Sequence, residues 1–230
     1  MAQKRIIITG CSRGIGRETV INLLRGEHEV LALSRSHASF DELKTEYDKL
    51  FSLELDITKK EDLDEVVKFV ERQWGTVDIL IHNAGMLLNK PFGTTSFEDM
   101  LSVYQVNVFS VAELTRRMIP YLVNGSHVVA ISSMGGIQGS MKFPGLAAYS
   151  SSKGALITLM ELLAEEYKEA GIAFNTLALG AVQTEMLAEA FPGYMASITP
   201  SNMGAYVANF ALSGNELFNG KVLQVSNSTP

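Results

Sequence analysis

The pattern of apolar and polar residues alternates between two periods along most of the chain. Short, nearly continuous apolar runs predict strands buried on both faces, and the longer segments between them repeat their apolar positions with the period of a helix. The expected strands are residues 4–9, 29–34, 51–55, 77–82, 127–133, 172–179 and 221–225. The expected helices are residues 14–25, about 39–50, 60–74, 96–121, 147–170 and 199–213.

This regular alternation of strands and helices indicates a parallel sheet, because consecutive parallel strands need a crossover, which is usually a helix. No internal repeat or linker divides the chain. We therefore predict one doubly wound α/β domain over residues 1–230, with a Rossmann-type, parallel seven-stranded sheet and helices on both faces.

Composition narrows the class of protein. The 230 residues are 47% hydrophobic and 19% charged, which is typical of a globular domain, and the net charge of −6 argues against nucleic acid or an anionic membrane as a partner. The single cysteine, Cys11, excludes an intrachain disulfide and fits a reducing compartment. With no long apolar run and a strand expected from residue 4, we expect no membrane span or signal peptide, and a cytoplasmic protein.

A glycine-rich turn follows the first expected strand. Residues 9–16 (TGCSRGIG) space their glycines as G-x-x-x-G-x-G and lead directly into a helix. Glycine is needed where the backbone approaches a pyrophosphate closely, and a helix N-terminus attracts such an anion. The spacing alone fits a plain structural turn equally well, but its position after the first strand favours a dinucleotide site.

Tyr149 and Lys153 are four residues apart at the start of an expected helix, so their side chains share one face. A free tyrosine has a pKa of about 10, which leaves it roughly 4 kcal/mol from acid–base work at neutral pH. An ammonium group about 4 Å away supplies energy of that order at an effective dielectric near 20. The alternative is an ordinary tyrosine and a solvated lysine on an amphipathic helix.

Six motifs follow one another in an order that resembles the short-chain dehydrogenase/reductase family. They are residues 9–16, Asp56-Ile57, Asn83-Ala84-Gly85, Asn107, Ser132-Ser133 and the Tyr149/Lys153 pair. The resemblance covers essentially the whole chain and is to the single-domain form, in particular to NADP-dependent carbonyl and 3-oxoacyl reductases. It implies an oxidoreductase that transfers a hydride between a nicotinamide cofactor and a carbonyl or secondary alcohol.

The resemblance assigns four catalytic positions. It implies that Tyr149 exchanges a proton with the substrate oxygen and that Lys153 lowers the pKa of Tyr149 and binds the nicotinamide ribose. Ser133 would donate to the substrate oxygen and Asn107 would anchor a water that links Lys153 to solvent. Ser132 competes with Ser133, because side chains alternate along a strand and only one of the two can face the cofactor.

The same resemblance assigns the cofactor-binding positions. They are Gly10, Ser12, Arg13, Gly14, Ile15, Gly16, Ser34, Arg35, Asp56, Ile57, Asn83, Ala84, Gly85, Tyr149, Lys153, Gly180, Val182 and Thr184. Arg35 at the end of the second strand, with Arg13, favours NADP(H) over NAD(H), since arginine accommodates a 2′-phosphate; the alternative is two solvated surface arginines. Asp56 would meet the adenine amino group and Thr184 the carboxamide. For Asn83 a purely structural role is equally open.

Residues 86–95, 134–146 and 184–198 are expected to frame the substrate. They are rich in methionine and aromatic residues, and their cations are Lys90 and Lys142, which suits an uncharged, partly apolar small molecule. Three features depart from the family, and one of them is Ser226-Asn227-Ser228 in place of its C-terminal Asp-Gly-Gly. The spacing from Ser133 to Tyr149 is about three residues longer than usual, which a loop tolerates at little cost, and Leu179-Gly180 replaces Pro-Gly.

The helix of residues 147–170 predicts self-association. Residues 154–164 (GALITLMELLA) are apolar on almost every side of the helix. A helix that covers a sheet is expected to have a polar face exposed to solvent. We expect a homodimer or homotetramer through helices 96–121 and 147–170. The four histidines are scattered without metal-ligand spacing, so no metal is expected. A non-catalytic NADP(H)-sensing regulator on the same fold remains the alternative to an enzyme.

Overall fold

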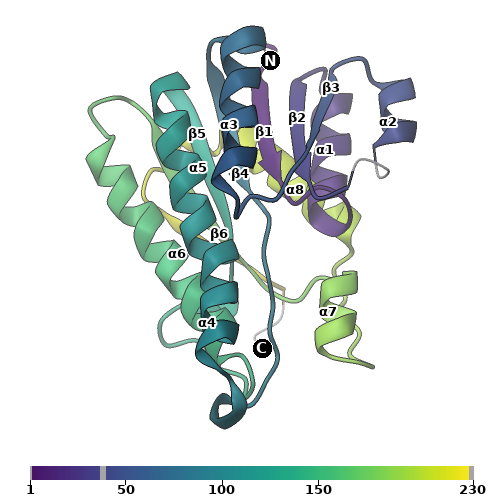
Figure 1. Ribbon diagram of the computed structural model, residues 1–230, viewed down its shortest axis with the longest axis vertical. Helices are drawn as coiled ribbons and strands as arrows, with labels where there is room; N and C mark the ends of the chain where they lie inside the picture. The colour runs from purple at the N-terminus through teal and green to yellow at the C-terminus, as the bar shows by residue number, and fades with distance from the viewer. Residues whose placement is uncertain (1, 37–39, 228–230) are drawn as a thin grey trace.

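The computed structural model describes residues 2–36 and 40–227 and forms one parallel sheet (Figure 1). Its seven strands lie in the order β3-β2-β1-β4-β5-β6-β7, which confirms the predicted Rossmann-type α/β fold. The order reverses between β1 and β4, and such a switch point opens a crevice at the carboxyl ends of the strands. The strands are β1 (Arg5–Thr9), β2 (Glu29–Ser34), β3 (Leu50–Glu54), β4 (Val77–His82), β5 (Leu122–Ser133), β6 (Ala173–Leu179) and β7 (Val222–Val225).

Helices cover both faces of this sheet. The α-helices are α1 (Gly14–Arg25), α2 (Asp41–Glu46), α3 (Lys60–Phe69), α4 (Phe97–Tyr104), α5 (Ser110–Met118), α6 (Ala147–Glu166), α7 (Glu185–Ala190) and α8 (Pro200–Ser213). Side chains alternate along β1, so Ile6 and Ile8 join the core under α1 and α8, and Ile7 joins the core under α3, α5 and α6. This division into two cores is the doubly wound arrangement that the sequence predicts.

The expected helix of residues 96–121 is interrupted. It divides into α4, a π-helical turn (Gln105–Phe109), α5 and a 3₁₀ turn (Ile119–Tyr121). Ser96 does cap α4 as expected, since its side chain accepts the Asp99 amide and Asp99 accepts the Ser96 amide. The π turn carries Asn107, and such turns often occur at functional sites.

Several other boundaries differ from the prediction. The expected helix 39–50 is limited to Asp41–Glu46, because Tyr47 turns to an extended conformation and Leu50 begins β3; Ser39 lies outside the described residues. β5 begins at Leu122, which pairs with Val77 ahead of a break in register. α6 ends at Glu166, and α7 was not predicted, although Thr184 caps it by accepting the Leu187 amide.

The parallel sheet brings the sequence motifs to one edge. The glycine-rich turn, residues 83–85 and Gly180 lie at the carboxyl ends of β1, β4 and β6, and Ser133 is the last residue of β5. α4 and α7 extend beyond this same edge (Figure 1). No described helix has the combination of length and apolar character that crossing a membrane requires.

Candidate active site

Tyr149 and Lys153 lie in the first turns of α6, one turn apart as the spacing predicts. The Lys153 side chain is only 3% exposed, and its Nζ donates to the Ile131 carbonyl at 2.8 Å. The same nitrogen lies 5.9 Å from the centre of the Tyr149 ring. The pair is therefore held against the end of β5 rather than in solvent.

Burial controls the pKa values of this pair. It raises the pKa of Tyr149, although an interaction with the Ser133 side chain opposes the rise, and it lowers the pKa of Lys153 to about 8. The expectation that Lys153 lowers the pKa of Tyr149 stays a prediction, because the shifts described here come from burial and from Ser133. Removal from water disfavours the charged form of both groups, and this effect dominates here.

The two adjacent serines at the end of β5 have different partners. Ser132 is buried, and its hydroxyl donates to the Lys153 carbonyl at 2.9 Å. Ser133 is half-buried, its oxygen accepts the Gly135 amide at 3.2 Å, and its side chain interacts with Tyr149. Of the two candidates, Ser133 is therefore the one that faces the tyrosine, and Ser132 fixes β5 to α6.

Asn107 is fully buried and satisfies both sides of its amide. Its Nδ2 donates to the Met86 carbonyl and to the Ser152 hydroxyl, both at 2.9 Å, and its Oδ1 accepts the Met86 amide at 2.8 Å. A Cβ at Gly85 would lie 3.4 Å from Lys153 Nζ and 3.5 Å from Asn107 Oδ1. Asn107 thus joins the strand-four loop to α6, directly beside the lysine.

The glycine-rich turn packs closely on the loop that follows β4. Gly10 has φ +71°, and a Cβ there would lie 2.6 Å from Ala84 Cα. A Cβ at Gly16 would clash with Nδ2 of the Asn83 side chain. Asn83 Nδ2 donates to the carbonyls of Gly10 at 2.8 Å and Thr9 at 3.1 Å. The hydroxyl of Thr9, the first residue of the glycine-rich motif, accepts the backbone amides of Asn83 and Ala84 at 3.1 Å. Asn83 therefore has at least the structural role.

The first turn of α1 offers its amides to an anion. Arg13 at the N-cap is extended and makes no side-chain cap, and the first turn contains no acidic residue. Gly14, where the helix begins, has φ +59°, a conformation that favours glycine. Because glycine has no side chain, the backbone is left open at this point. Uncapped amides at a helix N-terminus, with Ser12 and Ile15 beside them, fit the pyrophosphate of a dinucleotide.

The two arginines expected to select the cofactor lie in different settings. Arg13 forms an exposed ion pair with Glu189 of α7, at 3.2 Å. Arg35 is exposed immediately after Ser34, whose hydroxyl donates to the Ser36 carbonyl at 2.7 Å. Glu189 was not predicted, because nothing in the sequence places it beside the glycine-rich turn.

Asp56 and Ile57 form the turn between β3 and α3. Asp56 Oδ1 accepts the Thr58 amide at 3.0 Å and the Thr58 hydroxyl at 2.8 Å. Burial raises the pKa of Asp56, but these hydrogen bonds and the charges of Lys59 and Arg35 outweigh it and hold the pKa below its usual value. Asp56 is thus an ionised group near Arg35.

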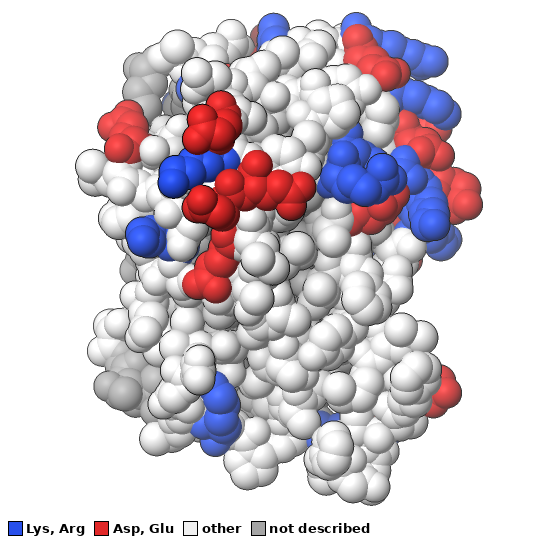
Figure 2. Space-filling model, turned by 90° about the vertical axis from the view of Figure 1, so that its left-hand side faces the viewer, with Lys and Arg blue, Asp and Glu red and all other residues white. Residues whose placement is uncertain are grey.

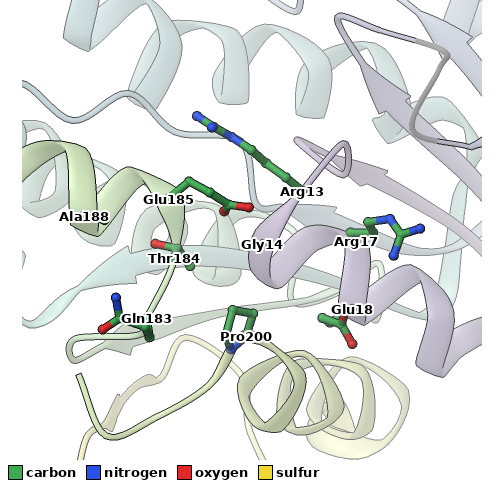
Figure 3. A pocket seen from close by; sticks show the side chains of 9 residues that line it. All are labelled: Arg13, Gly14, Arg17, Glu18, Gln183, Thr184, Glu185, Ala188 and Pro200. Atoms are coloured by element: carbon green, nitrogen blue, oxygen red, sulfur yellow. The ribbon is translucent and has the colours of Figure 1, made fainter. Parts of the chain in front are cut away.

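A hollow of about 500 Å³ separates the glycine-rich turn from α7 (Figure 3). Its lining residues are Arg13, Gly14, Arg17, Glu18, Gln183, Thr184, Glu185, Ala188 and Pro200. Val182 precedes two of these residues in sequence and pairs with Ile198, and Gly180 packs so closely on Ser226 that a Cβ there would clash with Ser226 Oγ. The hollow contains the expected cofactor residues Arg13, Gly14 and Thr184, whereas Tyr149 lies outside its lining.

The three segments expected to frame the substrate meet one another. Lys90 donates its amide to the Gly145 carbonyl at 2.9 Å, and Asn89 Nδ2 donates to the Ala190 carbonyl of α7 at 2.8 Å. Their two lysines are engaged within the protein. Lys90 Nζ contacts Asp99 Oδ2 at 2.5 Å, and Lys142 Nζ bonds to oxygens of its own loop.

Metal and thiol chemistry find little support in this region. Across residues 2–36 and 40–227, no group of three His, Cys, Asp or Glu side chains could hold a metal ion. Cys11 is fully buried, its thiol lies 3.0 Å from the Ile8 carbonyl, and burial raises its pKa. A thiol that stays protonated is a poor nucleophile, so Cys11 fills space in the glycine-rich turn.

Comparisons with known proteins agree with this geometry. A 3-oxoacyl-(acyl-carrier-protein) reductase FabG from Thermotoga maritima is 31% identical over 190 residues, covering 80% of this chain and 76% of that protein. A gluconate 5-dehydrogenase from Gluconobacter oxydans is 31% identical and covers 96% of this chain and 92% of its own.

A solved structure supports the same relationship. The 3-ketoacyl-(acyl-carrier-protein) reductase from Brucella melitensis, complexed with NADH, superposes with a TM-score of 0.85 at 25% identity, over 96% of both chains. The family described as short chain dehydrogenase matches residues 4–194. The chain therefore belongs to the short-chain dehydrogenase family of oxidoreductases.

Proposed function

We propose that this protein transfers a hydride between NADP(H) and a carbonyl or secondary alcohol of an uncharged, partly apolar small molecule. The observation that carries the proposal is the meeting of Tyr149 and Ser133 beside the buried Lys153, at the carboxyl edge of the sheet in a family of oxidoreductases. The cofactor supplies the hydride when bound, so the protein has to orient the reactants and provide one proton.

Each site residue has a role in this proposal. Tyr149 protonates the substrate oxygen during reduction, and Ser133 holds that oxygen by a hydrogen bond. Lys153 binds the nicotinamide ribose and, when charged, favours the tyrosinate that the reverse reaction needs. Asn107 anchors the water that links Lys153 to solvent. The α1 amides, with Gly10 and residues 83–85, hold the dinucleotide.

The preference for NADP(H) rests on Arg13 and Arg35. Both are exposed cations: Arg13 lines the hollow beside the glycine-rich turn, and Arg35 follows β2 at the carboxyl edge of the sheet. The related Brucella reductase is complexed with NADH, so family membership alone does not decide the cofactor. We expect a higher kcat/KM with NADPH than with NADH, and a selective loss with NADPH in Arg35→Ala. Equal or inverted values in the wild-type protein would contradict the preference.

The uncharged substrate rests on the engagement of Lys90 and Lys142. Because Lys90 pairs with Asp99 and Lys142 bonds to three oxygens of its own loop, neither offers a free cation to an anionic substrate. The three segments also carry methionine and aromatic residues, which suit a partly apolar substrate. Neutral ketones should therefore be reduced with higher kcat/KM than carboxylate-bearing ketones of the same length.

A panel of neutral ketones with NADPH tests the reaction itself. Tyr149→Phe should lower kcat by about 10²- to 10⁴-fold, because the ring is kept while the proton donor is lost. Its affinity for NADPH, measured by calorimetry, should change little. NADPH binding without turnover in the wild-type protein would instead favour the NADP(H)-sensing regulator.

Self-association is the last part of the proposal. Phe97, Leu101, Phe109 and Leu162 are large apolar side chains exposed on α4, the π turn and α6. Figure 2 shows that charged side chains gather on one part of this face and leave a wide uncharged area. These exposed apolar side chains, on a face with a wide uncharged area, support a homodimer or homotetramer through residues 96–121 and 147–170. A monomer mass by light scattering at micromolar concentration would contradict it.

A further inference from the structure

The loop between β5 and α6 is closed by one side chain. Lys142 Nζ donates to the carbonyls of Gly135 at 2.9 Å and Ile137 at 2.6 Å and to Ser140 Oγ at 2.7 Å. An ammonium group has three donors, and these three oxygens use all of them. The Ser140 hydroxyl in turn donates to the Met134 carbonyl at 2.6 Å. We call residues 134–142, closed in this way, the Lys142 ring.

The Lys142 ring is joined directly to the expected oxygen site. The Gly135 carbonyl accepts from Lys142, while the Gly135 amide donates to Ser133 Oγ at 3.2 Å. Ser133 itself interacts with Tyr149. A continuous set of contacts therefore runs from Lys142 through the Gly135 residue to Ser133 and Tyr149.

The ring also fits tightly against α6. A Cβ at Gly135 would lie 2.7 Å from Ser150 Oγ, and one at Gly136 would lie 2.7 Å from the backbone carbon of Lys153. These distances are too short for any side chain, so the two glycines let the loop backbone touch the helix. A shift of the ring would therefore move Ser133 relative to the first turns of α6.

We propose that Lys142 is a positioning residue, which closes the loop of residues 134–142 and so holds the Ser133 hydroxyl at the substrate oxygen. The inference rests on the proposed function, because it assigns Lys142 to the same site. It also accounts for the longer spacing between Ser133 and Tyr149. A longer loop has more conformations to lose, and three charge-assisted hydrogen bonds restrict them.

A double-mutant cycle tests whether Lys142 acts through Ser133. Lys142→Met should lower kcat for a neutral ketone on the order of tenfold, less than the roughly 100-fold that a 1 Å misplacement can cost, and leave the KM for NADPH unchanged. In a Ser133→Ala background the same substitution should lower kcat by less than about twofold, because its target is gone. Equal effects in both backgrounds would overturn the proposal.

Two further variants separate the ring from simple charge effects. Lys168→Met removes another exposed lysine, at the far end of α6, and should leave kcat unchanged. Lys142→Arg keeps the charge, but a planar guanidinium cannot aim three donors at the same converging oxygens. Its kcat should stay low, and full activity in Lys142→Arg would overturn the proposal in favour of charge attraction on the substrate.

Amide exchange at Gly135, followed by NMR, gives a readout that does not need turnover. The Gly135 amide should exchange at least about tenfold faster in Lys142→Met than in the wild-type protein, because its acceptor is no longer held in place. Unchanged exchange would overturn the inference whatever the activity. If the wild-type protein reduces no ketone, the proposed function fails separately, and the exchange rate still decides whether Lys142 holds the Gly135 amide.

Discussion

The floor and the rim of the candidate site are built differently. The floor, defined as Asn107, Ser132, Ser152 and Lys153, is at most 3% exposed, and its polar groups bond to one another or to the backbone. The rim, defined as Arg13, Asn89 and Glu189, makes its polar contacts in exposed positions. Both regions are well supplied with hydrogen bonds, so their number does not distinguish them.

Burial explains the difference. An unpaired polar atom in the interior costs free energy, so each floor residue has one arrangement that satisfies its partners. An exposed ion pair gains little over hydration, so the rim contacts can open at small cost. A rigid floor suits proton transfer at a fixed distance, and a rim that opens suits the entry of cofactor and substrate.

Acid should reveal the largest effect of polar burial. The His82 ring is hydrogen-bonded to the Thr115 hydroxyl, and the His127 ring lies between the Ala211 carbonyl and the Asn175 side chain. Burial lowers the pKa of His82 to about 3 and that of His127 to about 4. The unfolded chain binds these protons near pH 6.5, so the stabilisation is complete above that pH and is lost as the pH falls. Between pH 7 and 5 each histidine should remove about 2 kcal/mol from the free energy of unfolding.

Urea unfolding at the two pH values measures this loss. His82→Asn cannot titrate in this range, so its drop between pH 7 and 5 should be smaller than that of the wild-type protein by about 2 kcal/mol. Since most carboxyl groups titrate below pH 5, they contribute little in that interval. Equal stability of the wild-type protein at pH 7 and 5 would show that the buried polar groups do not carry the predicted energy.

Removal of one amide from each region compares floor and rim directly. Asn107→Ala leaves the Met86 amide, the Met86 carbonyl and the Ser152 hydroxyl without their buried partner, and should cost about 2–4 kcal/mol. Asn89→Ala removes an exposed bond to the Ala190 carbonyl and should cost less than about 1 kcal/mol. Thermal unfolding of both variants measures the difference, and similar losses would break the comparison.

The smallest effect is expected at the ion pair between Arg13 and Glu189. Both side chains are more than half exposed, so Glu189→Gln should change the free energy of unfolding by less than about 0.5 kcal/mol. It should nevertheless lower the KM for NADPH by up to about fivefold, because the carboxylate no longer competes for Arg13. Glu169→Gln, which removes the same charge beyond α6, is the control. A raised KM in Glu189→Gln would instead mean that the pair supports cofactor binding.

The sequence predicted the sheet and the buried floor of the site better than the exposed rim. The periods of the strands and helices, together with the helical connections between strands, were enough to predict the parallel sheet. Helix geometry alone predicted that Tyr149 and Lys153, four residues apart, share one face of a helix. The resemblance favoured Ser133 over Ser132, but the contacts that separate the two serines involve Tyr149 and Lys153, which lie far from them in sequence. Glu189, Asn89 and the Lys142 ring depend on loop conformation, which no short-range pattern determines. The π turn at Asn107 was missed because its residues are also compatible with a continuous helix.

Transfer of label from the cofactor tests the central claim most directly. NADPH carrying deuterium at the reactive position of the nicotinamide is incubated with a neutral ketone in ordinary water, and the alcohol is analysed by mass spectrometry. We expect one deuterium in each alcohol formed by the wild-type protein, and at least about a hundredfold less labelled alcohol per unit time from Tyr149→Phe. Alcohol without deuterium, or label transfer that Tyr149→Phe leaves unchanged, would contradict the account.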